Sequence, residues 1–267
     1  MFTTYWEMQF NPFSKELSAE HYFESEDFRQ ATARLNHVKE IKCMGLFTGH
    51  PGTGKTSTIK KFMDSLNPSL FKCVYLPLST VTVMEFYRAL AFGIGILPSF
   101  KKIDMFNSIQ ERIISLSKDR NITTVIAIDE GQYLHTKILN DLKILLNFDM
   151  DSKNYAAVII SGLPALTNAL VGQTHEALTQ RIVINYTFNG LSKTELGDYI
   201  GTRLKACGVH TNMFSDNAME AIWGCSSGCP RVINNLAEKC LLLGFQKNAK
   251  VIDNEIVMLA NNEISLI

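Results

Sequence analysis

The chain has 267 residues, of which 46% are hydrophobic and 19% are charged, and its 26 basic and 26 acidic side chains give a formal net charge of zero. This composition supports a hydrophobic core and excludes a globally disordered chain. The length suits one large α/β domain with a smaller second one. Zero net charge neither favours nor excludes nucleic acid, because a local basic stripe can lie on a neutral protein.

Nothing in the sequence indicates export or membrane insertion. Residues 1–10 lack a basic stretch followed by an apolar core, which is the pattern of a signal peptide. The longest apolar run, residues 89–97, is far shorter than the ~20 residues that a membrane helix needs. We therefore expect a soluble, cytoplasmic protein with no membrane partner. The six cysteines are scattered without a zinc-binding spacing, which favours reduced thiols.

Aromatic residues are concentrated in the first 24 positions, and two interpretations remain open for them. They form either a strap packed on the domain surface or, in part, a cover for an adenine ring, which needs flat apolar partners. A helix follows, capped by Ser25 and extending to about Lys39.

A complete phosphate-binding loop, Gly49-x-x-x-x-Gly54-Lys55-Thr56, lies between an apolar strand (44–47) and a helix (55–65). Its glycines lack a Cβ and allow positive φ, so the backbone N–H groups can surround phosphate oxygens. Lys55 is expected to reach the β- and γ-phosphates, and the Thr56 hydroxyl to ligate Mg²⁺. The residues predicted to contact the nucleotide here are Gly49, Pro51, Gly52, Thr53, Gly54, Lys55, Thr56 and Ser57.

A second motif follows the strand 124–128, whose apolar residues predict burial on both faces of a parallel sheet. Asp129 and Glu130 come at its carboxyl end, where open α/β sheets place ligands. Asp129 is predicted to hold Mg²⁺, mainly through its waters, and Glu130 to orient and polarise the attacking water. Together with Lys55, Glu130 makes ATP hydrolysis the expected activity, with ATP and Mg²⁺ as cofactors.

The remaining pattern predicts alternating strands and helices up to about residue 189, then helices alone. Ser161, after the strand 155–160, either hydrogen-bonds the γ-phosphate or water, or simply makes a turn. The other elements expected are strands 71–76 and 182–188, and helices 82–92, 103–121, 132–147, 163–170, 174–180, 192–207, 215–223, 232–245 and 253–261. We therefore predict an α/β fold with a P-loop parallel sheet flanked by helices, in a nucleotide-binding domain (1–189) with a small helical lid (190–267).

Four motifs in a fixed order resemble those of the AAA+ ATPases. They are the phosphate loop, Asp129-Glu130-Gly131-Gln132, Gln180-Arg181-Ile182, and Gly228-Cys229-Pro230-Arg231-x-Ile233-Asn234-x-Leu236. The chain is most similar to the ExeA/GspA-type branch, which includes ATPases encoded by bacterial transposons, of the TnsC, TniB and MuB type. The opening Asn11-Pro12-Phe13, followed by Tyr22-Phe23, is also similar to that branch.

The resemblance implies hydrolysis at the boundary between subunits of a homo-oligomer, either a ring or a filament. Arg181 matches the family's finger arginine, which reaches the γ-phosphate of a neighbouring subunit. Arg231 matches the second sensor, which acts from the lid of its own subunit, and Ser161 lies at the first-sensor position. Without the resemblance, Arg181 would be interpreted as an ordinary surface arginine.

The resemblance leaves three functions open. The first is an ATPase that assembles on double-stranded DNA and selects targets with a transposase or another recombination protein. The second is a secretion or envelope motor, and the third is a signalling or defence switch. We expect the first, because secretion motors of this branch usually continue into a membrane segment and this sequence ends at Ile267. The pairs Lys101/Lys102 and Lys137/Lys143 are either DNA-phosphate contacts or solvated surface.

Overall fold

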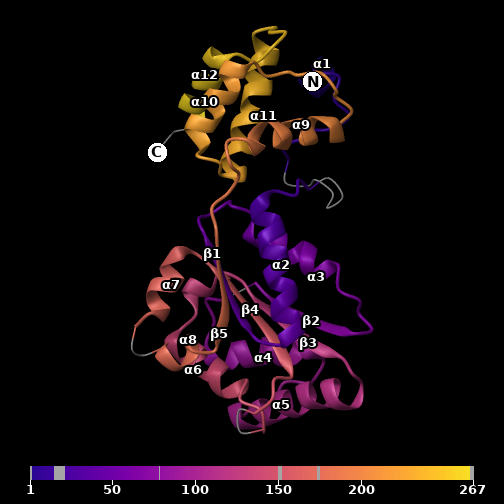
Figure 1. Cartoon of the computed structure of the whole chain (residues 1–267), viewed down its shortest axis with the longest axis vertical. Coiled ribbons are helices and arrows are strands. Elements are labelled where there is room, and N and C mark those ends of the chain that lie inside the picture. Colours follow the sequence, from indigo (N-terminus) through magenta and orange to yellow (C-terminus); the bar gives the residue numbers. More distant parts are fainter. Residues whose placement is uncertain (1, 15–21, 78, 150–151, 173–174, 265–267) are drawn as a thin grey trace. The chain divides into compact units, whose positions relative to one another are not determined.

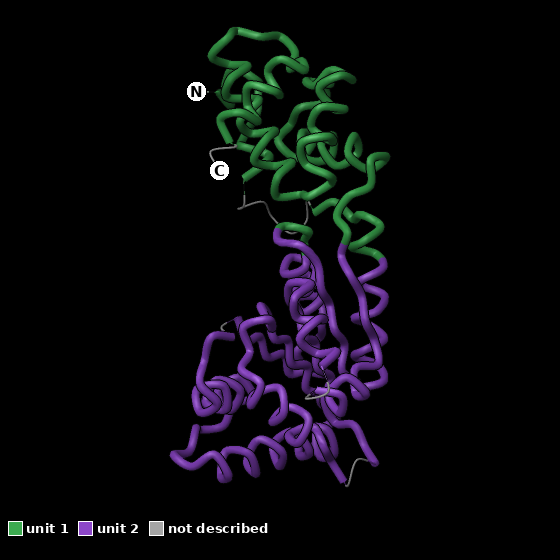
Figure 2. The backbone as a smooth tube through the Cα atoms, turned by 90° about the vertical axis from the view of Figure 1, so that its left-hand side faces the viewer, with its two compact units in different colours: residues 1–29, 52–54, 189–267 green, residues 30–51, 55–188 purple. Residues whose placement is uncertain are grey.

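The computed structural model describes residues 2–14, 22–77, 79–149, 152–172 and 175–264. Contacts divide the chain into two compact units, coloured separately in Figure 2. Unit 1 comprises residues 1–29, 52–54 and 189–267, and unit 2 comprises residues 30–51 and 55–188. Within the described ranges, no helix has both the length and the apolar character that crossing a membrane requires.

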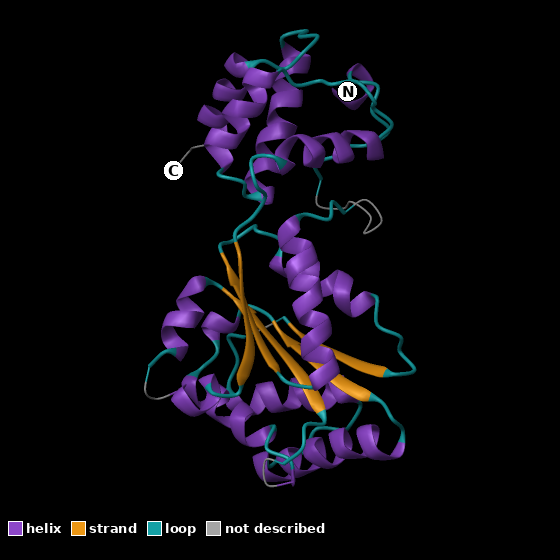
Figure 3. Ribbon diagram, in the orientation of Figure 1, coloured by secondary structure: helices purple, strands orange, loops and turns teal. Residues whose placement is uncertain are grey.

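Unit 2 contains a five-stranded sheet in the order β2-β3-β4-β1-β5, with every neighbouring pair parallel (Figures 1 and 3). Every residue of β1 and β4 is buried, because helices cover both faces. The predicted parallel sheet is confirmed. The strands are β1 Met44–Gly49, β2 Phe71–Leu76, β3 Thr123–Ile128, β4 Ala156–Gly162 and β5 Ile182–Phe188.

Helices pack on both faces of this sheet. One face is covered by α2 Glu26–Ile41, whose first residues belong to unit 1, and α3 Lys55–Asp64. Their core includes Leu35, Phe47 and Phe62. The opposite face is covered by five helices that share a second core. They are α4 Val83–Ile94, α5 Lys102–Asp119, α6 Thr136–Leu145, α7 Pro164–Leu170 and α8 Glu176–Thr179.

Local sequence signals account for most helix boundaries. A capping box begins α4: the Thr82 hydroxyl accepts from the Glu85 amide, and the Glu85 carboxylate accepts from the Thr82 amide. Gly95 ends α4 in the left-handed conformation, with φ of 86°. Thr174, the predicted start of one helix, lies outside the described residues, and that helix is seen as α8.

The single helix predicted from residue 132 to 147 is wrong. A short 3₁₀ turn, Gly131–Tyr133, is followed by the extended Leu134, and α6 begins only at Thr136. The His135 imidazole Nδ1 accepts from the Lys137 amide at 3.1 Å, which caps α6. The Gln132 side chain bonds to Glu130 and to the Leu163 amide, and these contacts favour the 3₁₀ turn over a helix that continues into α6.

Unit 1 is mainly helical, with one isolated β-bridge between Phe214 and Ile252 among its described residues. Ser215 caps α10 by accepting from the Ala218 amide, and Pro230 occupies the first turn of α11. The Glu195 carboxylate accepts from the Ser192 amide, but the N-terminal cap of α9 is Thr194, so the helix begins later than residue 192. The helices are α1 Phe2–Tyr5, α9 Glu195–Ala206, α10 Asp216–Ser226, α11 Pro230–Gln246 and α12 Asn254–Ile264.

The N-terminal aromatic residues belong to the core of unit 1. Trp6 is 6% exposed and Phe13 is 2% exposed, and the Trp6 indole Nε1 donates to the Leu241 carbonyl at 2.9 Å. For these two residues the structure supports the packed-strap interpretation. Contacts also group residues 1–29 with the C-terminal helices, whereas the sequence assigns them to the nucleotide-binding domain. The domain bounds 1–189 and 190–267 stay a prediction.

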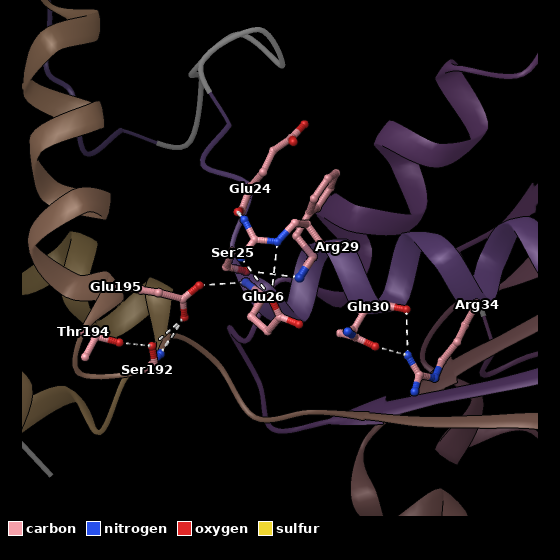
Figure 4. A network of polar contacts seen from close by, with 10 residues as sticks. Glu24, Ser25, Glu26, Arg29, Gln30, Arg34, Ser192, Thr194 and Glu195 are labelled. Carbon is pink, nitrogen blue, oxygen red and sulfur yellow. Dashed lines mark hydrogen bonds and ion pairs between the residues drawn. The ribbon is translucent and has the colours of Figure 1, made fainter.

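Within unit 1, polar contacts connect the start of α2 with residues 189–195, which lead into the first turn of α9 (Figure 4). The Glu195 carboxylate accepts from the Glu26 amide at 2.7 Å, and Asp27 accepts from the amides of Asn189 and Gly190, each at 2.7 Å. Burial alone would raise the pKa of Glu195, but hydrogen bonds from the Ser192 and Glu26 amides outweigh it and lower the pKa.

Replacing Trp6 tests whether the N-terminal segment is part of this core. We expect Trp6→Ala to lower the free energy of unfolding by about 3–5 kcal/mol, because it opens a cavity in the core and removes the indole hydrogen bond to the Leu241 carbonyl. Urea unfolding of the full chain followed by circular dichroism measures this. Tyr5→Phe is the control: it removes a hydrogen bond from an exposed hydroxyl to the Ala249 carbonyl and should cost about 1 kcal/mol or less. Equal stability of the Trp6→Ala variant and the wild type would contradict the packing.

Candidate active site

Parallel pairing brings the two predicted motifs to one edge of the sheet. β4 lies between β1 and β3, with Thr48 of β1 opposite Gly162 and Ile128 of β3 opposite Ile160. The phosphate loop leaves β1 at this carboxyl edge, and Asp129 and Glu130 leave β3 there. This is the edge at which open α/β sheets bind their ligands.

The phosphate loop has the backbone that its glycines predict. Gly52 and Gly54 have φ of 83° and 101°, in the left-handed region that other residues rarely adopt. The Lys55 side chain is buried, and its Nζ donates to the carbonyls of Gly49 at 2.8 Å and His50 at 3.0 Å. A helix N-terminus, several backbone amides and one buried ammonium together make a site for a phosphate chain.

Asp129 is 5% exposed and is held at both carboxylate oxygens. Its Oδ2 accepts from the Thr56 hydroxyl at 2.8 Å and from the Tyr75 hydroxyl at 2.9 Å, while its Oδ1 accepts from the Glu130 amide at 2.9 Å. The Ser79 hydroxyl donates to the Asp129 main-chain carbonyl. Hydroxyl and carboxylate oxygens are the ligands that Mg²⁺ prefers, so Thr56 and Asp129 fit such an ion, directly or through its waters.

Partial burial, and then the negative charge and hydrogen bond of Asp129, raise the pKa of Tyr75. Tyr75 is therefore a protonated donor at neutral pH. The Asp129 carboxylate thus has two hydroxyl donors, one from the phosphate-loop helix and one from the neighbouring strand β2.

Glu130 stands in a left-handed conformation, with φ of 53° and ψ of 38°, which is uncommon for a residue with a side chain. Its exposed carboxylate accepts from the Gln132 amide group at 2.6 Å. The Gln132 side-chain oxygen in turn accepts from the Leu163 amide at 2.9 Å. A Cβ on Gly162 would lie 2.7 Å from that oxygen, so this connection needs glycine there. Glu130 is therefore linked through Gln132 to the end of β4.

Ser161 lies within β4, opposite Phe47, and is fully buried. None of the described residues hydrogen-bonds its Oγ. A buried hydroxyl without a partner is costly, which is typical of groups that serve a ligand rather than the fold. This observation is compatible with the first-sensor role, which stays a prediction.

The two predicted arginines occupy different places. Arg181 immediately precedes β5, and because Ile182 pairs with Met44 at the start of β1, it lies at the amino edge of the sheet. A strand of this length puts it about 20 Å from the phosphate loop of its own molecule. Arg231 lies in unit 1, where its amide donates to the Gly52 carbonyl at 3.3 Å. A Cβ on Gly52 would come within 2.6 Å of Arg231 Cβ, so this approach also needs glycine.

Three residues of this site were not identified from the sequence: Tyr75, Ser79 and Gln132 as the tether of Glu130. Their roles depend on strand register and on the turn after β3. The sequence shows only that Tyr75 lies near the carboxyl end of a predicted strand. The register that places Tyr75 opposite Ala127, two residues before Asp129, comes from the structure.

Residues 40–170 match the family model of the AAA domain. This match includes the phosphate loop and the Asp129-Glu130 motif. An AAA domain implies a P-loop NTPase, whose nucleotide is typically bound with Mg²⁺. The chain is also 27% identical over 270 residues to general secretion pathway protein A of Aeromonas hydrophila. That alignment covers 99% of this chain and 49% of the relative, so the chain spans about half the length of that relative.

Solved structures share the fold over nearly the whole chain. Cdc6p from Pyrobaculum aerophilum has a TM-score of 0.72 at 17% identity, covering 96% of this chain and 71% of that one. The Aeropyrum pernix ORC1 protein in complex with DNA has a TM-score of 0.61 at 16% identity, with coverage of 95% and 68%. The Thermotoga maritima RuvB branch migration motor has a TM-score of 0.57 at 19% identity, with coverage of 91% and 70%. These likenesses confirm the AAA+-like α/β fold and, at this identity, the fold alone.

Removing the buried ammonium of the loop tests the site directly. We expect Lys55→Ala to weaken ATP binding at least tenfold, or about 1.4 kcal/mol, because a cation facing the β- and γ-phosphates is lost. Titration with a fluorescent ATP analogue measures the affinity. Lys60→Ala, on the exposed face of the same helix, is the matched control and should bind as the wild type does. Equal affinity of both variants would refute the phosphate-loop assignment.

Proposed function

We propose that this protein binds ATP with Mg²⁺ and hydrolyses it at contacts between its own copies, as an ATPase that serves a secretion pathway. The hydrolytic part rests on one observation above all, the hydrogen bond from Thr56 to Asp129 beside the tethered carboxylate of Glu130. The pathway rests on the similarity to general secretion pathway protein A along 99% of this chain.

Each side chain of unit 2 has a distinct task in this proposal. Lys55 exchanges its loop carbonyls for the β- and γ-phosphate oxygens and offsets their negative charge. Thr56 and Asp129 hold Mg²⁺, which neutralises charge on the same oxygens when it is bound. Glu130 orients the attacking water and accepts its proton as the bond between the γ-phosphorus and the leaving oxygen breaks. Gln132 keeps the Glu130 carboxylate in place until the water is bound.

Arg181 acts on a neighbouring molecule. Its position at the amino edge of the sheet, about 20 Å from the loop of its own chain, is incompatible with a role there and supports a role in trans. Developing charge on the transferred phosphoryl group then meets a second cation beside Lys55. Hydrolysis consequently requires a homo-oligomer, and ring or filament assembly is part of the proposal.

Arg231 and Ser161 sense the nucleotide in this proposal. Arg231 is supported by its backbone contact with Gly52 of the phosphate loop, inside unit 1. Ser161 is supported by its buried Oγ, for which the described residues provide no partner. Both roles concern the γ-phosphate, so their loss should affect ATP more than ADP.

The alternative is the function that we expect from the sequence, an ATPase that assembles on double-stranded DNA with a transposase. The fold likeness to replication and recombination proteins, one of them solved with DNA, supports it. That support is weaker, because the likeness is to the fold alone. One of the lysines considered for DNA contact, Lys102, forms an ion pair with Asp141 at 2.6 Å. Because the chain spans about half of its secretion relative, its last residue does not favour either function.

Mixing two inactive variants tests hydrolysis in trans. Arg181→Ala alone and Glu130→Gln alone should each bind ATP and hydrolyse it about 10³-fold more slowly or worse. Their mixture should recover activity, because some contacts then pair an intact Glu130 with an intact Arg181 of the neighbour. Phosphate release measures the rate.

The control mixture pairs Arg231→Ala with Glu130→Gln. If Arg231 acts on the nucleotide of its own molecule, every intact Glu130 shares its site with the altered Arg231, and little activity returns. If the Arg181 mixture stays inactive while the two variants demonstrably co-assemble, hydrolysis in trans is wrong.

DNA binding separates the secretion function from the alternative. We expect no ATP-dependent binding to double-stranded DNA, because the relative that matches along the chain is a secretion protein and Lys102, one of the lysines considered for DNA contact, is already paired with Asp141. Fluorescence anisotropy with a labelled duplex, at low salt and with Mg²⁺ and a non-hydrolysable ATP analogue, measures it. Binding that requires the nucleotide, is absent in Lys55→Ala and weakens as salt rises would instead favour the DNA function.

A further inference from the structure

Asp129 has a second hydroxyl donor that the nucleotide site itself does not require. Tyr75, on β2, donates to Asp129 Oδ2 at 2.9 Å, the same oxygen that accepts from Thr56. The segment after β2 adds two more connections to the main chain of Asp129. The Asp129 amide donates to the Leu76 carbonyl at 3.0 Å, and the Ser79 hydroxyl donates to the Asp129 carbonyl.

The hydrophobic core does not explain Tyr75. Its side chain lies on the edge strand of the sheet and is 44% exposed, whereas its neighbours Val74 and Leu76 are 3% and 6% exposed and belong to the core. With 44% of its surface exposed, Tyr75 gains less from burial than its core neighbours do. The hydroxyl is the part of Tyr75 with a defined partner, and that partner is the carboxylate predicted to hold Mg²⁺.

The geometry of the sheet sets this contact. In the register of β2 and β3, Tyr75 lies opposite Ala127, and Asp129 is two residues further on the same face. The long Tyr75 side chain carries its hydroxyl across to the neighbouring strand, where it donates to the Asp129 carboxylate at 2.9 Å. A carboxylate with two free torsions is thereby fixed in one orientation before any ion arrives.

We propose that Tyr75 is a positioning residue that holds the Asp129 carboxylate in the orientation that Mg²⁺ requires, so that it sets the dependence of nucleotide binding on Mg²⁺. The proposal rests on the proposed function, since Asp129 must serve the ion. Residues that hydrogen-bond a metal-binding carboxylate typically change metal affinity by about 10–100-fold when they are removed. The hydrogen bond of the Tyr75 hydroxyl goes to Asp129, so Tyr75 would act on the ion through that carboxylate.

The test compares nucleotide affinity with and without Mg²⁺. A fluorescent non-hydrolysable ATP analogue is titrated into the full chain in EDTA and again in saturating Mg²⁺, and the ratio of the two dissociation constants is recorded. For Tyr75→Phe we expect unchanged affinity in EDTA and about tenfold less strengthening by Mg²⁺. This ratio of dissociation constants does not depend on hydrolysis, so it does not require the contribution of Arg181 from a neighbouring molecule.

Tyr155→Phe is the matched control. It removes another tyrosine–aspartate hydrogen bond of unit 2, from the Tyr155 hydroxyl to Asp149 at 2.5 Å. Tyr155 precedes β4 at the amino edge of the sheet, away from the phosphate loop. We expect the Mg²⁺ ratio of this variant to equal that of the wild type. Thermal unfolding of both variants shows whether either change disturbs the fold.

The outcomes distinguish the metal role of Asp129 from the positioning role of Tyr75. A wild type whose nucleotide affinity does not depend on Mg²⁺ contradicts the proposed metal role of Asp129, and the role of Tyr75 with it. A wild type that responds to Mg²⁺ alongside a Tyr75→Phe variant that responds equally overturns the role of Tyr75 alone. Equal weakening of Tyr75→Phe in EDTA and in Mg²⁺ also overturns it, because that is the effect of a damaged loop.

Discussion

The hydrogen bond between the Thr56 hydroxyl and Asp129 is the contact on which the site depends. It joins two motifs 73 residues apart, one in the first turn of α3 and the other at the end of β3. The two strands that lead to these motifs are not neighbours, since β4 lies between β1 and β3. The bond therefore requires three strands in correct register and α3 packed on the face that Asp129 occupies.

The residues around this bond are under tight steric constraint. Gly162 ends the intervening strand, and a Cβ there would collide with Gln132 and Leu166. Gly131 is similarly restricted by Ile160 and Leu166. Glu130 has a left-handed backbone conformation, which residues with a Cβ adopt mainly where the surrounding structure imposes it. Small residues and local strain together bring a carboxylate, an amide and a hydroxyl to one sheet edge.

Much of the fold could be predicted because its signals are local. The strands 71–76 and 182–188 have the predicted bounds, since apolar runs between turns are sufficient to recognise them. The capping box at Thr82 and the proline at the start of α11 likewise act through neighbouring backbone groups. The phosphate loop was recognisable because its glycines and lysine serve a function through their spacing alone.

What the sequence did not reveal depends on contacts between distant segments. The helix predicted from residue 132 is interrupted because Gln132 bonds to the end of β4, 31 residues away, at the Leu163 amide. Residues 2–5 form a helix that no periodicity indicates, and Trp6 beside it packs into the helical core of unit 1. Tyr75 reaches Asp129 only in one register of β2 against β3, and the sequence of either strand alone does not determine that register.

The most direct test of the account is a crystal structure of the protein with Mg²⁺ and a non-hydrolysable ATP analogue. The account predicts phosphates surrounded by the amides of residues 49–56, and a Mg²⁺ ion bound by the Thr56 hydroxyl at about 2.0–2.1 Å. Asp129 should remain beside Thr56, in contact with the ion or its waters. A nucleotide bound elsewhere, or an ion remote from both Thr56 and Asp129, would contradict the central claim.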